Sequence, residues 1–168
     1  GFFFAKELQK AFEKETPIAL INTAMGSAYA ECYINKETLQ RTPSAQPFLN
    51  KAAKEMTPGK SDKKSYWGEN NFRRPAALFN GKVAPLLPLT VRGVIWYQGE
   101  GNSQKWLAPG YAETLTALIT SWRQGFEQDA LPFLIVQLPR FKHGPGSDWA
   151  MIRAAQAQVA QNMQYVEV

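Results

Sequence analysis

The chain has 168 residues, of which 45% are apolar and 20% are charged, and its formal net charge is +5. This length and composition are typical of one globular domain with a sizeable core, and they exclude an intrinsically disordered chain. No apolar run approaches the ~20 residues that a membrane-spanning helix needs, so we expect no membrane span.

Apolar spacing predicts the first two elements of the chain. Four apolar side chains recur at the spacing of one helix face: Phe4, Leu8, Ala11 and Phe12. They predict an amphipathic helix over residues 2–15. Thr16 ends it, because a residue before a proline is pushed out of the helical conformation. The apolar run at 17–23 is predicted to be a buried strand, followed by a loop at 24–28.

The middle of the chain, residues 35–75, is rich in Lys, Pro, Asn and Gly and is predicted to run over the surface with short helical turns. Five of its lysines fall between Lys51 and Lys64, together with Pro58 and Gly59. A face that binds nucleic acid would combine basic residues with aromatic side chains that stack on bases. We therefore interpret this stretch as a solvated loop and expect no nucleic-acid partner.

Two further strands and two helices are predicted in the second half. The apolar runs at 93–97 and 132–138 are typical of buried parallel strands. Between them, a helix that could begin at Pro109 and ends near Glu127 has one apolar face. This face comprises Tyr111, Leu115, Leu118, Ile119, Trp122 and Phe126.

After the strand at 132–138, Ser147 or Asp148 could cap a helix that carries Trp149 and Ile152. Residues 165–168 are predicted to begin a further strand. Cys32 is the only cysteine, which excludes an internal disulfide and a cysteine metal cluster. Helices that alternate with apolar strands predict an α/β fold with a parallel sheet.

A polar cluster with two glycines, QGEGN at 98–102, follows the predicted strand at 93–97 directly. In open α/β sheets, ligands bind just beyond the carboxyl ends of the strands. An amide, a carboxylate and adaptable backbone at this point therefore predict a functional site.

Five segments of the chain carry a family resemblance. They are IALINTAMGS at 18–27, RPAALFNGKVAPLLPLTV at 74–91, RGVIWYQGEGN at 92–102, LPFLIVQL at 131–138 and WAMIRAAQ at 149–156. In this order they resemble the sialate O-acetylesterase family, a carbohydrate-esterase branch of the SGNH (GDSL-like) hydrolases. The resemblance implies a three-layer α/β/α fold with a parallel sheet. It also implies that residues 1–168 form a single, partial SGNH hydrolase-like esterase domain, incomplete at both ends.

The resemblance also implies roles for individual residues. Gln98 matches the glutamine of the family's Gln-Gly-Glu motif, whose amide can donate to an oxyanion; the alternative is a glutamine that caps a strand end. Gly26 would offer a backbone N–H to the same oxyanion, or would be an ordinary turn glycine. Ser27 beside it is expected to be a loop contact rather than a nucleophile. Glu100 is expected to accept hydrogen bonds from backbone or arginine groups and to hold the loop rigid.

The roles of four further positions are less definite. Asn80 and Arg92 match the family pattern and could belong either to the scaffold or to the rim of the site. Gln156 lies on the apolar face of its predicted helix, so it must reach a neighbouring loop or line the pocket. Gly101 stands where the family usually has a serine or another polar residue, which removes a hydroxyl group from the loop.

The catalytic blocks of the family, Gly-x-Ser and Asp-x-x-His, have no convincing match in the chain. Gly59-Lys60-Ser61 follows a proline in the lysine-rich stretch and has no strand before it. His143, the single histidine, is not preceded by an aspartate at the required distance. We therefore expect the nucleophile and the base to lie outside these 168 residues, which would leave the isolated chain inactive.

The function expected from the resemblance is hydrolysis of acetyl esters on sugars by a serine mechanism, with sialic acid or another acetylated glycan as substrate. No metal and no organic cofactor are implied. An extracytoplasmic location, periplasmic or secreted, is expected from the same resemblance. The alternative is a non-catalytic carbohydrate-binding protein with a degenerate SGNH fold.

Overall fold

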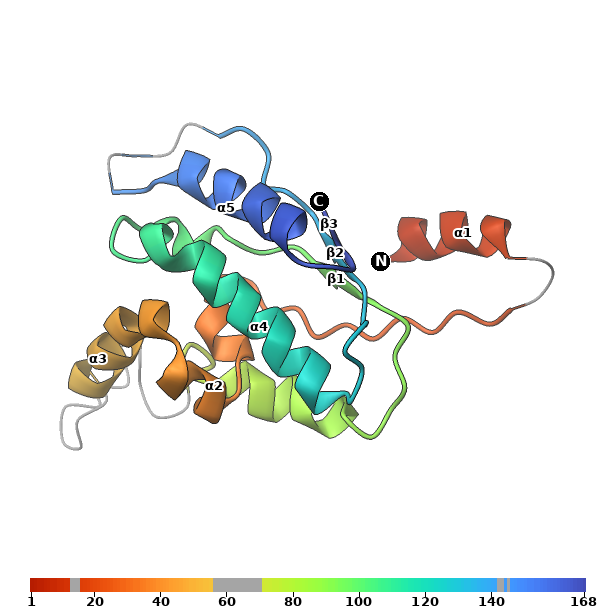
Figure 1. The fold of residues 1–168 in the computed structure, drawn as a ribbon, viewed down its shortest axis with the longest axis horizontal. Coiled ribbons are helices and arrows are strands. Elements are labelled where there is room, and N and C mark those ends of the chain that lie inside the picture. The colour runs from red at the N-terminus through yellow and green to blue at the C-terminus, as the bar shows by residue number, and fades with distance from the viewer. Residues whose placement is uncertain (13–15, 56–70, 142–143, 145) are drawn as a thin grey trace.

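The computed structural model describes residues 1–12, 16–55, 71–141, 144 and 146–168 (Figure 1). Its sheet has three parallel strands in the order β1-β2-β3. These strands are β1 (Val94–Trp96), β2 (Phe133–Ile135) and β3 (Val166–Glu167). Val94 pairs with Phe133, which in turn pairs with Val166.

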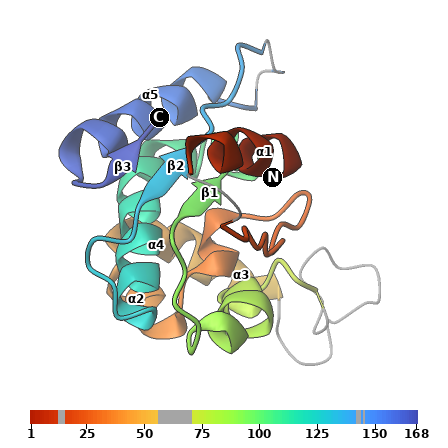
Figure 2. The same ribbon diagram turned by 90° about the vertical axis from the view of Figure 1, so that its right-hand side faces the viewer.

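Helices lie on both sides of this sheet. They are α1 (Phe2–Ala11), α2 (Lys36–Arg41), α3 (Gln46–Glu55), α4 (Tyr111–Gly125) and α5 (Trp149–Asn162). Figures 1 and 2 show α4 and α5 on one side of the sheet and α1 on the other. Within the described residues, no helix is both long enough and apolar enough to cross a membrane.

The core forms between the sheet and α4. Trp122 of α4 packs edge-on against Trp96 of β1 and Phe133 of β2, with ring centroids 6.1 and 6.0 Å apart. Its indole N–H donates to the carbonyl of Tyr33 over 2.8 Å, which satisfies the polar atom of this buried ring. The helix is thereby fixed against both strands and against the 28–34 segment, whose side chains are buried or nearly so.

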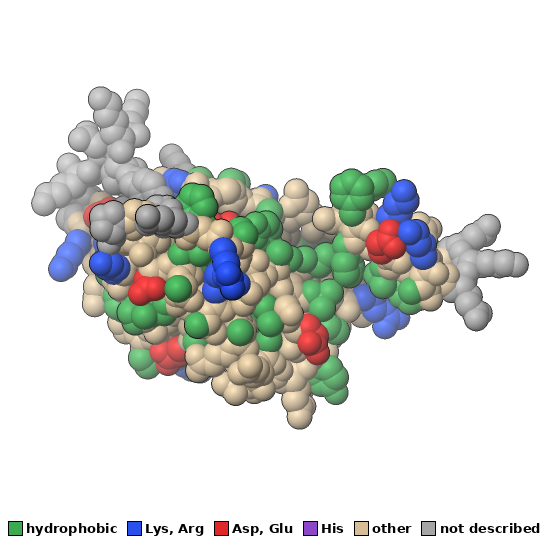
Figure 3. All heavy atoms as spheres, turned by 90° about the horizontal axis from the view of Figure 1, so that it is seen from above, with side chains coloured by type: hydrophobic (Ala, Val, Ile, Leu, Met, Phe, Trp, Pro, Cys, Tyr) green, Lys and Arg blue, Asp and Glu red, His purple; other side chains and the backbone are tan. Residues whose placement is uncertain are grey.

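The opposite face of the sheet is open. Strand residues alternate between the two faces, and Ile95 and Leu134 point away from α4, with 40% and 37% of their surface exposed. Helix α1 lies on this side but has no buried residue. Figure 3 shows hydrophobic side chains on the surface between α1 and the main body.

Most of the predicted elements are present. The strands predicted at 93–97, 132–138 and 165–168 contain β1, β2 and β3, and α4 and α5 lie within the predicted helices. The side chain of Asp148 caps α5 by accepting from the backbone N–H of Met151. The predicted α/β class with a parallel sheet is confirmed, and the three layers agree with the expected α/β/α arrangement.

The strand predicted at 17–23 is wrong. In the part of the chain that the structure describes, these residues run without a strand partner, and Leu20 and Ile21 are about half exposed. An apolar run satisfies the side-chain requirement of a buried strand, but it does not specify which strand its backbone will pair with. In the described part of the chain, the parallel sheet is therefore formed by β1, β2 and β3, without residues 17–23.

The prediction for 35–75 was only partly correct. Helices α2 and α3 lie in this stretch, but they bury Leu39, Phe48 and Ala52 in the core instead of running over the surface. Asn35 caps α2 through a 2.7 Å bond from the N–H of Thr38. Residues 56–70, which include the Gly-Lys-Ser at 59–61, lie outside the described residues.

Candidate active site

The polar loop 98–102 follows β1 at the carboxyl edge of the sheet and is wedged between two other segments. Gly99 has φ +146°, and a Cβ atom there would lie 2.6 Å from Cγ2 of Ile152 in α5. A Cβ atom at Gly101 would lie 2.9 Å from the carbonyl oxygen of Ala28. Both glycines are therefore required by close approach, since any side chain would push the loop away from α5 or from the Ala28 backbone.

Gln98 is buried, with 8% of its surface exposed, and every polar atom of its side chain is hydrogen-bonded. Its Nε2 donates to the carbonyl of Ala28 over 3.1 Å and to Oδ1 of Asn102 over 2.7 Å. Its Oε1 accepts from the hydroxyl of Tyr111 over 3.0 Å. The two protons of this amide thus both have acceptors within the protein.

The Tyr111 hydroxyl is a stable donor in this network. Burial raises the pKa of Tyr111 well above its usual range, and the nearby charges of Glu31 and Glu100 act in the same direction. The phenol therefore keeps its proton at physiological pH. It lies within hydrogen-bonding distance of both the side-chain and the backbone oxygen of Gln98.

Gln156 joins the loops that follow β1 and β2. This residue of α5 is fully buried; its Oε1 accepts from the N–H of Leu138 and its Nε2 donates to the carbonyl of Gln98, both over 3.0 Å. Of the two possibilities for Gln156, the structure selects contact with neighbouring loops.

Glu31 and Asn102 extend the network into the protein. The Nδ2 of Asn102 donates to both carboxyl oxygens of Glu31, over 3.2 and 2.9 Å. The Oδ1 of Asn102 also accepts from the N–H of Ala30 over 2.9 Å. Burial raises the pKa of Glu31 to about 7, although the hydrogen bond from Asn102 lowers it.

Sequence reasoning did not identify Glu31, and it gave Asn102 no individual role. A signal for Glu31 was available, because it is the single charged residue within the otherwise mostly apolar stretch 28–34. A carboxylate in such a stretch must either leave the core or find a hydrogen-bond partner.

Gly26 and Ser27 form an exposed turn before this buried segment. Ser27 has φ +61°, and its carbonyl accepts from Nε of Arg73 over 3.1 Å. Among the described residues, no heavy atom beyond its chain neighbours lies within 4 Å of the position that a Cβ of Gly26 would take. The backbone at Gly26 is therefore open to an approaching ligand, two residues before the carbonyl that Gln98 binds.

Glu100 is exposed, and its backbone carbonyl, rather than its carboxylate, makes the contacts that hold the loop. That carbonyl accepts from the hydroxyl of Ser103 over 2.7 Å, and Ser147 donates to the same hydroxyl oxygen over 2.7 Å. The loop after β1 is thereby joined to the segment that precedes α5. His143 lies outside the described residues.

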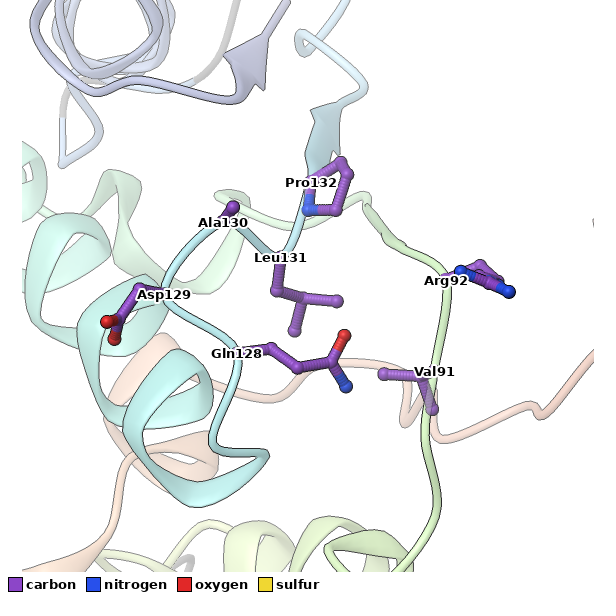
Figure 4. A pocket seen from close by; sticks show the side chains of 7 residues that line it. All are labelled: Val91, Arg92, Gln128, Asp129, Ala130, Leu131 and Pro132. Atoms are coloured by element: carbon purple, nitrogen blue, oxygen red, sulfur yellow. The ribbon is translucent and has the colours of Figure 1, made fainter.

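Asn80 and Arg92 are not part of this network. Asn80 is exposed within the helical turn Phe79–Val83. Arg92 precedes β1, so it lies at the amino edge of the sheet, whereas Gln98 follows the carboxyl edge. Arg92 lines a separate pocket of about 530 Å³, in which its side chain and that of Asp129 point away from each other (Figure 4).

A family model and two sequence relatives match the chain. A family model described as a carbohydrate esterase, sialic acid-specific acetylesterase, matches residues 1–168. The chain is 27% identical over 152 residues to a sialate O-acetylesterase of Mus musculus and 30% identical over 156 residues to one of Rattus norvegicus. Each alignment covers 79% of this chain and 28% of the relative, so the chain spans little more than a quarter of these proteins.

One solved structure resembles the chain closely. The crystal structure of a carbohydrate acetylesterase from Xanthomonas citri matches with a TM-score of 0.74 and 30% sequence identity. The match covers 99% of this chain and 32% of that structure's chain.

Proposed function

Since the chain belongs to the sialic acid-specific acetylesterase family of carbohydrate esterases, we propose that it supplies the oxyanion side of a site that hydrolyses acetyl esters on carbohydrates. The observation that carries the proposal is the network around Gln98. In this network a neutral amide donor follows the carboxyl end of β1 and binds the carbonyl of Ala28, two residues after the exposed Gly26. Ligands of open α/β sheets bind at this edge.

Ester hydrolysis places negative charge on the carbonyl oxygen of the acetyl group when a nucleophile attacks. Gln98 stabilises this charge with one proton of Nε2. The oxyanion competes with the Ala28 carbonyl for that proton, and a charged acceptor makes the stronger hydrogen bond. The hydrogen bond to the Ala28 carbonyl, at 3.1 Å, is the longer of the two, so its proton is donated to the oxyanion instead. The 2.7 Å bond to Asn102 keeps the amide in place.

The backbone N–H of Gly26 is the second donor in this proposal. The open space around Gly26 lets the acetyl oxygen approach its main chain. The hydrogen bond from Nε of Arg73 to the Ser27 carbonyl holds this turn.

Attack on the acetyl carbon requires a nucleophile and a base that takes its proton. We assign these roles to a serine and a histidine beyond the 168 residues, in agreement with the longer chains of the relatives. Glu100, Asn80 and Arg92 contact substrate or support the scaffold outside the oxyanion site. The residues 1–168 belong to one domain, and the proposed location is extracytoplasmic.

The proposed substrate class is an O-acetylated carbohydrate, with sialic acid and other acetylated glycans as the members to compare. The test is release of acetate by the full-length protein from O-acetylated sialic acid and from an acetylated plant glycan. Turnover of either substrate supports the esterase. Saturable binding of the acetylated glycan without acetate release would instead support the non-catalytic carbohydrate-binding alternative.

A further inference from the structure

Glu31 is a carboxyl group in an unusual environment. It lies in the short helical turn Ala30–Tyr33 with 1% of its surface exposed. Among the described residues, no lysine or arginine forms an ion pair with it. Burial of a carboxyl group without a cation is unfavourable unless hydrogen bonds compensate. An apolar side chain would fill a purely structural position of this kind more easily. We therefore infer that the hydrogen-bond acceptors of the Glu31 carboxyl group have a role.

The two oxygens of Glu31 set the orientation of the Asn102 amide. Both lie within 3.2 Å of Nδ2, so the NH2 group of Asn102 must point towards Glu31. The amide oxygen then faces the opposite way, where it accepts from the N–H of Ala30 and from Nε2 of Gln98. If the amide were rotated by half a turn, its NH2 group would face these two donors instead.

The orientation of Asn102 in turn determines that of Gln98. One proton of Nε2 is bound to Oδ1 of Asn102 over 2.7 Å, and Oε1 accepts from Tyr111. These two bonds place the remaining proton of Nε2 on the side of the Ala28 carbonyl, two residues after Gly26 in the chain. The carboxyl group of Glu31 therefore controls, through one intervening amide, the direction in which Gln98 presents its other proton.

We propose that Glu31 is a positioning residue for the acetyl-ester site, which orients the Gln98 amide through Asn102 without touching the substrate. This inference rests on the proposed function of Gln98 as an oxyanion donor. It extends that function to a three-residue relay, Glu31–Asn102–Gln98. The first member of this relay, Glu31, lies outside the motif at 98–102.

The test is a double-mutant cycle in the full-length protein. Glu31→Gln replaces one acceptor oxygen by an NH2 group that opposes the NH2 of Asn102. Asn102→Asp alone brings two carboxyl groups into contact. In the double variant Glu31→Gln/Asn102→Asp, the new glutamine donates to the new aspartate, whose other oxygen still accepts from Ala30 and Gln98. The control is Glu37→Gln, which neutralises an exposed glutamate of α2.

Kinetics and stability are measured together, at a temperature at which every variant is folded. We expect Glu31→Gln to lower kcat by ~10-fold to ~10²-fold with little change in KM, as expected when a catalytic group is misplaced. The double variant should recover most of this loss, and Glu37→Gln should match the wild type. Unchanged kcat in Glu31→Gln, or a loss that only follows the unfolded fraction, would overturn the proposal.

Nuclear magnetic resonance separates this inference from the proposed function. The side-chain amide resonances of Gln98 should shift in Glu31→Gln and return in the double variant, whether or not the protein hydrolyses esters. If the wild type releases no acetate but these resonances respond, the esterase function fails and the positioning relay stands. If the resonances stay fixed in Glu31→Gln, the relay is wrong.

Discussion

The side chain of Gln98 donates a hydrogen bond to the backbone carbonyl of Ala28 over 3.1 Å, across 70 residues of sequence. This bond joins the loop that follows β1 to the buried segment that follows the turn at Gly26. Asn102 adds a second link four residues later, through the N–H of Ala30. The two loops that would surround an acetyl oxygen are therefore held as one unit.

Gly101→Ala should loosen this unit. The new Cβ would lie 2.9 Å from the Ala28 carbonyl oxygen, so one of the two backbones must move. We expect the free energy of unfolding to fall by about 1–3 kcal/mol, as for other overpacked sites. Urea denaturation measures this loss. The control is Gly81→Ala, where the added Cβ has no heavy atom of the described residues within 4 Å beyond its chain neighbours and its own helical turn. Equal effects in the two variants would contradict the close approach.

Gln156→Ala should destabilise the protein, mainly through a backbone N–H that loses its acceptor. It removes the acceptor of the buried Leu138 N–H and one of two donors to the Gln98 carbonyl, which keeps the Tyr111 hydroxyl. We expect a loss of about 1–3 kcal/mol in thermal or chemical unfolding. Gln158→Ala, on the exposed side of the same helix, provides the matched control. A loss no larger than that of the control would show that water replaces the Gln156 contacts.

Stability should depend on pH through Glu31. Burial raises the pKa of its carboxyl from 4.5 to about 7. Between these values the folded protein binds more protons than the unfolded chain, so the free energy of unfolding falls as pH rises. The stabilisation that Glu31 contributes is complete below the unfolded pKa of 4.5 and is lost as pH rises through the folded pKa of about 7. This stabilisation amounts to about 3 kcal/mol.

The measurement for this pH dependence compares chemical unfolding of the wild type and Glu31→Gln between about pH 5 and pH 8. All other ionisable groups are common to both proteins, so the difference isolates Glu31. The stability of the wild type relative to the variant should decrease with increasing pH. A difference that stays constant, or that grows with pH, would contradict the buried, near-neutral environment of Glu31.

The fold could be predicted from sequence where side-chain pattern alone decides the element. The runs at 93–97 and 132–138 and the apolar face that includes Trp122 predicted β1, β2 and α4, because these residues pack against one another within the chain. The run at 17–23 is also mostly apolar. Strand formation, however, also requires a hydrogen-bonded neighbour, which composition does not encode. Helix α3 was missed as a core element because half of its residues are polar, so its apolar positions Phe48 and Ala52 form no evident apolar run.

The QGEGN motif indicated the position of the candidate site, but the hydrogen bonds within the site were not predictable. The motif placed Gln98 at the carboxyl edge of the sheet, where the structure has it. The partners of Gln98 are Ala28, Asn102 and Tyr111, and two of these come from distant segments. A hydrogen bond between distant segments depends on the tertiary arrangement, so the spacing of residues along the sequence does not predict it. The burial of Glu31 follows from the same arrangement.

Residues 1–168 in isolation should not hydrolyse an activated acetyl ester such as p-nitrophenyl acetate. The reason is that this chain has no convincing serine nucleophile with its histidine base. The measurement is the release of p-nitrophenol above a buffer control. Turnover by the isolated chain that disappears in Ser27→Ala or His143→Ala would show that the nucleophile and base lie within these residues after all.

The most direct test of the account is the kinetic effect of Gln98→Ala in the full-length protein, with Gln161→Ala, a change at an exposed position of α5, as the control. Loss of one oxyanion donor typically lowers turnover by ~10²-fold to ~10³-fold. The account predicts a kcat lower by at least ~10²-fold for acetate release, with KM little changed and the variant still folded at the assay temperature. A wild-type kcat, or a loss confined to KM, would contradict the assignment of Gln98 as the donor that stabilises the oxyanion.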